Sequence, residues 1–212
     1  MENNFDRIYC LFYTPYKKER LIPISNELQR VGILNAKNFT FFYDCSSPYD
    51  EIMYKNIKIA YHPGDERLFI KKLSMKHYQM LKISYDLEYK KILIIEDDMR
   101  FLKDLNNLYD LLLKAPKDAD ITLFDKMIWK IPNEIYNKVF NNQLYLDYSN
   151  YNLFTLAFSS TGCYAVSRNG MDELITNYEN ALTASDTYTN NVPGLSIKMG
   201  CKKYVINENL AI

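Results

Sequence analysis

The chain has 212 residues, enough for one domain with a complete hydrophobic core. Its 26 Lys and Arg balance its 26 Asp and Glu, which argues against a nucleic-acid binder with a broad basic surface. Hydrophobic residues make up 48% and aromatic residues 15%, so a disordered chain is excluded. No apolar run reaches the roughly 18 residues of a membrane helix, and the start of the chain lacks the features of a signal peptide. We therefore expect a soluble, cytoplasmic domain.

Strand-like and helix-like segments alternate over about the first 125 residues. Pro15 after Thr14 is typical of a first helical turn, and Gly32 is typical of a helix end. The apolar pattern predicts strands at 7–13, 39–43, 57–61, 91–95 and 121–124, and helices at 15–31, 66–88 and 105–114. Such alternation indicates an α/β fold with a mainly parallel central sheet.

The last third of the chain is less regular. It predicts strands at 153–158, 164–167 and 203–206 and helices at 133–140 and 169–181. This order favours a mixed sheet at the C-terminal side. No internal repeat, low-complexity segment or linker interrupts the chain, so residues 1–212 are predicted to form a single domain.

Three consecutive acids follow the most apolar strand segment, 91–95. Glu96, Asp97 and Asp98 would stand at the carboxyl end of a buried strand, where ligands bind in open α/β sheets. Their charges repel one another unless a cation or a donor-rich ligand compensates them. Carboxylate oxygens suit Mg²⁺ or Mn²⁺, whose remaining positions are often filled by phosphate and water. The alternative is a solvated turn whose acids only cap a helix.

Two metal-using classes fit this acidic segment less well. A haloacid-dehalogenase-type phosphatase needs Thr or Val where this chain has Arg100. A response-regulator receiver domain would use Asp125, after the strand at 121–124, as its phosphoacceptor. Only 27 residues separate Asp98 from Asp125, whereas the intervening elements of a receiver need about 40 or more.

Six segments, in order, resemble glycosyltransferase family 25, which includes bacterial lipooligosaccharide and collagen galactosyltransferases. The resemblance covers most of the chain, with one departure: Lys76 stands where the family has Ser before its His. The matching segments are Arg7-Ile8-Tyr9-Cys10-Leu11 with Lys18-Glu19-Arg20, Lys76-His77-Tyr78, Ile94-Ile95-Glu96-Asp97-Asp98-Met99, Gly162 to Gly170 around Tyr164-Ala165-Val166-Ser167, Ser185-Asp186-Thr187-Tyr188, and Val205 to Ile212.

The resemblance implies a GT-A-like nucleotide-sugar-binding sandwich. Its donor-binding part would be about 1–125 and its acceptor-side part about 126–212. In this family type the last acid of the motif holds the metal, which assigns Mn²⁺ or Mg²⁺ to Asp98. Glu96 would reach the ribose or a metal-bound water, and Asp97 would do either or hold the loop.

Other positions receive roles in binding the UDP-sugar donor. Tyr13 and Thr14 follow the first strand, where the base and ribose would bind, and Asp44 follows the second; turn chemistry explains Asp44 equally well. Arg20 would offset diphosphate charge, although a solvated helix arginine is the simpler interpretation. His77 would face the donor or pack as a satisfied histidine against the sheet.

Asp186 is the candidate catalytic base for an inverting transfer, which needs one carboxylate to take the acceptor's proton. It is isolated in a polar stretch, and a helix N-cap is the competing interpretation. The resemblance thus implies transfer of a hexose, with galactose favoured, from a UDP-sugar to a glycan hydroxyl in bacterial surface-polysaccharide synthesis. The acceptor would be lipid-linked at the inner face of the membrane. The alternative is a non-catalytic nucleotide-binding or receiver-like signalling domain with an acidic metal pocket.

Overall fold

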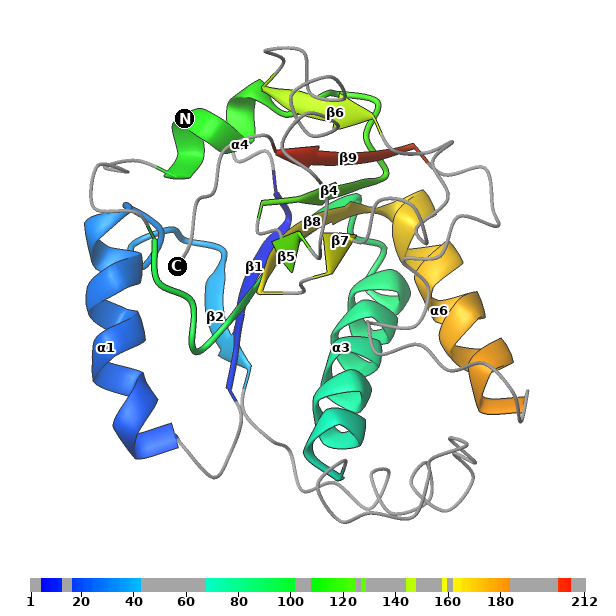
Figure 1. The fold of residues 1–212 in the computed structure, drawn as a ribbon, viewed down its shortest axis with the longest axis horizontal. Coiled ribbons are helices and arrows are strands. Elements are labelled where there is room, and N and C mark those ends of the chain that lie inside the picture. Colours follow the sequence, from blue (N-terminus) through cyan, green and yellow to red (C-terminus); the bar gives the residue numbers. More distant parts are fainter. Residues whose placement is uncertain are drawn as a thin grey trace.

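A computed structural model describes residues 5–12, 17–42, 68–101, 108–124, 127–128, 144–147, 158–159, 162–183 and 202–206 (Figure 1). Its helices are α1 (Lys17–Arg30), α3 (Leu68–Asp86), α4 (Leu108–Lys114) and α6 (Arg168–Thr183). Its strands are β1 (Arg7–Leu11), β2 (Phe39–Phe42), β3 (Lys91–Glu96), β4 (Ile121–Leu123), β5 (Met127–Ile128), β6 (Tyr145–Asp147), β7 (Phe158–Ser159), β8 (Cys163–Ser167) and β9 (Lys203–Ile206). The helices within these ranges are all too short or too polar to cross a bilayer.

The described strands form one seven-stranded sheet in the order β2-β1-β3-β8-β4-β9-β6, and β5 and β7 form a separate pair. Strands β2, β1 and β3 are parallel to one another. Strand β8 is antiparallel to both of its neighbours, β3 and β4, so β4 runs in the same direction as β3. Strand β9 is parallel to β4, and the edge strand β6 reverses again. The sheet is therefore mixed, and its reversed strands are β8 and β6.

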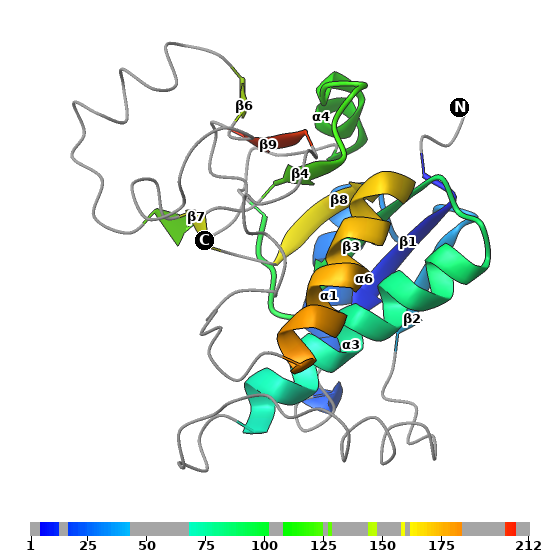
Figure 2. The same cartoon turned by 90° about the vertical axis from the view of Figure 1, so that its right-hand side faces the viewer.

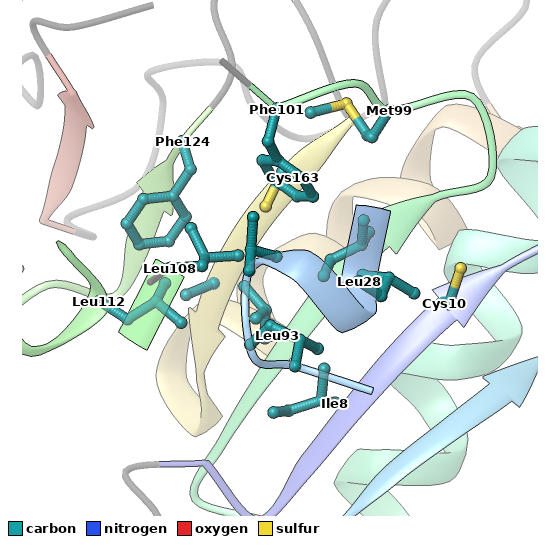
Figure 3. Packing of buried hydrophobic residues seen from close by; sticks show 14 of the residues in the cluster. Ile8, Cys10, Leu28, Leu93, Met99, Phe101, Leu108, Leu112, Phe124 and Cys163 are labelled. Carbon is teal, nitrogen blue, oxygen red and sulfur yellow. The ribbon is translucent and has the colours of Figure 1, made fainter. Parts of the chain in front are cut away.

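Helices cover both faces of the sheet (Figure 2). Helices α3 and α6 lie side by side on one face. On the opposite face, α1 and α4 bury apolar side chains against the sheet (Figure 3). Residues alternate between the faces along each strand, as a pleated strand requires. The cluster on the α1 and α4 face includes Ile8, Cys10, Ile24, Leu28, Leu93, Ile95, Leu108, Leu112, Cys163 and Ala165.

The α/β class and the predicted order of the main elements are confirmed. The sequence predicted a mainly parallel sheet with a mixed C-terminal part. The described seven-stranded sheet is mixed, with three parallel and three antiparallel pairings, and β8 lies at its centre. A receiver domain has an all-parallel sheet, so this topology does not support the receiver alternative. Strands β5 and β6 were not expected. The elements predicted at 57–61 and 133–140, and Asp125, lie outside the described residues.

Candidate functional site

The carboxyl ends of three parallel strands meet at one edge of the sheet. Leu11, the last residue of β1, pairs with Phe42 at the end of β2 and with Glu96 at the end of β3. The chain then turns through Asp97 and Asp98. We call Glu96, Asp97 and Asp98 the acidic turn. It lies where open α/β sheets bind their ligands, as the sequence predicted.

Buried side chains and helix α1 fix the segment that follows the acidic turn. Met99 and Phe101 are buried and belong to the same apolar cluster as Cys163 (Figure 3). The backbone N–H of Phe101 donates to Glu27 (3.2 Å), and its carbonyl accepts from Arg30 (3.0 Å). The exit from β3 is thus anchored to the C-terminal half of α1.

The three acids of the turn occupy three different environments. The Asp97 side chain is 3% exposed and accepts a hydrogen bond from Arg20 at 2.7 Å. The Glu96 side chain is 14% exposed, with Oε1 3.1 Å from Nε2 of His77. The Asp98 side chain is 55% exposed, with Oδ2 3.2 Å from the same Arg20. Two of the acids are therefore held by largely buried contacts, and Asp98 is the one that faces solvent.

Arg20 links α1 to the acidic turn. Its Nη1 lies within ion-pair distance of both Asp97 and Asp98. The sequence suggested either a diphosphate-binding role or a solvated arginine. The structure places the guanidinium on the two carboxylates, and the diphosphate-binding role stays a prediction. No local pattern could have found this pairing, since 77 residues separate Arg20 from Asp97.

The electrostatics single out Asp98. Partial burial, followed by the negative charge of Glu96, raises the pKa of the Asp98 carboxyl above its ordinary value, and Arg20 offsets only part of this. The ionised form of Asp98 is therefore disfavoured by its surroundings. A ligand that brings positive charge would relieve this repulsion.

His77 is fully buried on α3 and contacts two other elements. Its Nε2 lies 3.1 Å from Glu96 of β3, and its Nδ1 lies 2.9 Å from the hydroxyl of Tyr164 of β8. With its ring buried between these groups, His77 reaches the edge of the sheet through Glu96. This geometry favours the satisfied histidine over direct contact with a donor.

Two further residues at this end of the sheet went unassigned by the sequence. Tyr164 was noted only as part of a motif, yet its buried hydroxyl contacts His77. Lys76, also buried, donates from Nζ to the carbonyl of Phe12, just after β1 (2.9 Å). The sequence showed the pair Lys76-His77, but the burial of Lys76 is known only from the structure. The other predicted site residues, Tyr13, Thr14, Asp44 and Asp186, lie outside the described residues.

The acidic turn could hold a divalent cation only together with a bound ligand. Over the described ranges, no three His, Cys, Asp or Glu side chains are grouped so that they could hold a metal by themselves. Mg²⁺ and similar cations are commonly bound by one or two carboxylates together with substrate phosphates and water. The half-exposed carboxylate of Asp98 suits that arrangement.

The molecule is therefore a mixed α/β domain with an acidic turn at the carboxyl end of a central strand. Its sequence matches no protein-family model and no curated protein. Solved structures that resemble it include two glycosyltransferases. One is involved in the glycosylation of the major capsid of PBCV-1 (7% identity over 82% of this chain and 65% of that chain, TM-score 0.44). The other is mouse xyloside xylosyltransferase 1 in its apo form (10% identity over 83% of this chain and 71% of that chain, TM-score 0.46). The chain thus spans just under two thirds of the first structure's length, and these scores assign no residue and no substrate.

Proposed function

We propose that the chain is a metal-dependent glycosyltransferase that moves a hexose, with galactose favoured, from a UDP-sugar to a glycan hydroxyl. The observation that carries the proposal is that the three acids of the acidic turn have different partners and different exposure. Arg20 and His77 hold Asp97 and Glu96, while Asp98 is half-exposed and has a raised pKa. A carboxylate in that position is suited to a cation and the diphosphate that comes with it.

The cation, Mn²⁺ or Mg²⁺, would supply positive charge to the diphosphate leaving group. Asp98 would hold it, with phosphate oxygens and water as the other ligands. Arg20 keeps a second positive charge beside Asp98. Asp97 would fix that guanidinium, and Glu96 would bind the ribose or a water molecule at the same strand end.

The transfer itself would be inverting, as the resemblance to family 25 implies. The acceptor oxygen forms a bond to the sugar carbon on the face opposite UDP, while the bond from that carbon to the UDP oxygen breaks. Asp186 would take the proton of the acceptor hydroxyl as general base. Tyr13, Thr14 and Asp44 would bind the base and ribose of the donor.

The same resemblance carries the proposed setting. The acceptor would be a glycan, lipid-linked at the inner face of the bacterial membrane, and the product a surface polysaccharide. The fold by itself carries no such assignment, because one fold hosts many functions.

Calorimetric titration with UDP tests the proposal. We expect binding in the presence of Mn²⁺ and a loss with EDTA. Asp98→Asn should weaken the Mn²⁺-dependent binding by at least the roughly 10- to 100-fold seen when outer partners of a metal site are removed. Asp86→Asn, which removes an exposed carboxylate paired with Lys82 on α3, is the control and should bind normally. Equal UDP affinity with EDTA and with Mn²⁺ would contradict the metal site, and no UDP binding at all would contradict the function.

A further inference from the structure

Three side chains from three elements form a continuous buried contact behind the acidic turn. Tyr164 comes from β8, His77 from α3 and Glu96 from the end of β3. The Tyr164 hydroxyl lies 2.9 Å from Nδ1 of His77, and Nε2 of His77 lies 3.1 Å from Oε1 of Glu96. The two rings also stack, with centroids 5.7 Å apart and an interplanar angle of 29°. Tyr164 and His77 are both buried, which leaves Glu96 as the member nearest to solvent.

The chemistry of these groups sets the direction of the hydrogen bonds. An ionised carboxylate only accepts, so Nε2 of His77 must carry the hydrogen that points to Glu96. A ring that carries its one hydrogen on Nε2 has an acceptor at Nδ1, and the Tyr164 hydroxyl then donates to it. Burial, followed by the charge of Glu96, raises the pKa of Tyr164 well above its ordinary value, so the hydroxyl stays protonated. The hydrogens therefore run from Tyr164 through His77 to Glu96.

We propose that Tyr164 and His77 are positioning residues, which orient the Glu96 carboxylate for its contact with the nucleotide part of the donor. This inference rests on the proposed function and adds to it a residue, Tyr164, outside the acidic turn. The backbone of Glu96 is fixed independently, because its N–H donates to the carbonyl of Gly162 at 2.7 Å. The Tyr164–His77 pair acts on the Glu96 side chain itself, through the contact between Nε2 of His77 and Oε1 of Glu96.

The chain contains a matched control for Tyr164. Tyr9 pairs with Ile94 on one side of β3, and Tyr164 pairs with Ile94 on the other. The Tyr9 hydroxyl is also bound to α3, since it accepts a hydrogen bond from Ser84 at 3.1 Å. Both tyrosines are buried, but only Tyr164 contacts His77. Tyr9→Phe and Tyr164→Phe thus each remove one buried hydroxyl facing the same helix, and only Tyr164→Phe should affect Glu96.

Nitrogen NMR of the protein labelled with ¹⁵N-histidine tests the hydrogen-bond direction without any ligand. The sequence has two histidines, His62 and His77, so the spectrum of His77→Gln identifies the His77 signals. We expect hydrogen on Nε2 and none on Nδ1 of His77, in wild type and in Tyr9→Phe. Hydrogen on Nδ1 in the wild-type protein would overturn the proposed direction.

Titration with UDP and Mn²⁺ tests the positioning role. Tyr164→Phe should weaken UDP binding by about 3- to 10-fold, the effect of one lost hydrogen bond, while Tyr9→Phe should leave it unchanged. His77→Gln keeps an N–H donor for Glu96 but removes the ring nitrogen Nδ1 to which the Tyr164 hydroxyl donates. In the His77→Gln background, Tyr164→Phe should therefore cause little further loss, because its effect passes through His77.

The possible outcomes separate this inference from the proposed function. If wild type binds UDP and Tyr164→Phe binds it as well as Tyr9→Phe does, the positioning role is wrong and the proposed function stands. If the effect of Tyr164→Phe is as large in His77→Gln as in wild type, His77 does not transmit it and the inference also fails. If wild type binds no UDP, the proposed function fails and the inference fails with it.

Discussion

Asp98 differs from its two acidic neighbours in how its charge is compensated. Its side chain is 55% exposed, and partial burial together with the charge of Glu96 raises its pKa above 3.8. In the pH range between 3.8 and the higher folded pKa, the native state binds more protons than the unfolded state. The free energy of unfolding therefore falls as pH rises through this range, and the cost is fully present above it.

Asp98→Asn should consequently be as stable as the wild-type protein at pH 7, or more stable. The gain should stay below about 1 kcal/mol, because solvent screens a half-exposed charge, and it should disappear as pH falls below 3.8. Urea unfolding at pH 7 and at pH 3.5 measures both. Asp86→Asn, at the end of α3, is the control. It should be neutral or slightly destabilising at pH 7, because it removes the exposed ion pair with Lys82. A destabilised Asp98→Asn would mean that Arg20 more than compensates the charge of Asp98.

At the scale of single residues, the sequence predicted the acids but not their partners. Glu96, Asp97 and Asp98 were visible because three charges directly after an apolar run need compensation. Arg20 and His77 were candidates, yet their actual contacts depend on how α1 and α3 pack against β3. That packing is set by the whole core, and no local pattern encodes it.

Two helices end in the same way but with different residues. At the end of α1, the N–H groups of Gly32 and Ile33 donate to the carbonyls of Gln29 and Leu28. At the end of α3, the N–H groups of Glu88 and Tyr89 donate to those of Tyr85 and Ser84. Both are Schellman motifs, in which the residue after the C-cap adopts a left-handed conformation. Gly32 has φ 79° and Glu88 has φ 59°.

Glu88→Gly should stabilise the protein, because an L-residue in the left-handed region costs about 1–2 kcal/mol. Greater freedom of glycine in the unfolded chain offsets part of this, so we expect a net gain of about 0.5–1 kcal/mol. Thermal and urea unfolding would measure it. The reverse change at the matching position, Gly32→Ala, should destabilise by a similar amount. Equal stability of Glu88→Gly and wild type would show that the side chain of Glu88 makes compensating contacts.

At the scale of elements, the long periodic segments were predicted well. Gly32 correctly marked the end of α1, and the apolar block at 91–95 correctly marked β3. The short strands β5 and β6 were missed because two or three residues have no measurable period. Strand β4 is as short, but the continuous apolar run at 121–124 predicted it. Glu88 gave no signal for the end of α3, since the cap there depends on backbone conformation and not on residue type.

At the scale of the whole molecule, the sheet depends on strand β8, which lies between β3 and β4. Strand β8 pairs with β3 on one side and β4 on the other, although about 70 and 40 residues separate it from them in the chain. The strand at 164–167 was predicted, but its position was not, because pairing over such distances depends on the assembled core. The position of β8 beside β3 also brings Tyr164 into contact with His77.

A catalytic base for the proposed transfer must come from outside the acidic turn, because those acids are assigned to the donor. Asp186 is the candidate, and Asp186→Asn should keep UDP-sugar binding while lowering turnover by roughly 10²–10⁴-fold, the size of a general-base contribution. Release of UDP from UDP-galactose with a glycan acceptor measures turnover, and calorimetry measures binding. A helix-capping role would instead leave the Asn variant active, since Asn is itself a good cap, and Asp186→Ala would lose about 0.5–2 kcal/mol of stability. Turnover of Asp186→Asn within a few-fold of wild type would therefore remove Asp186 from the mechanism and direct the search to other acids.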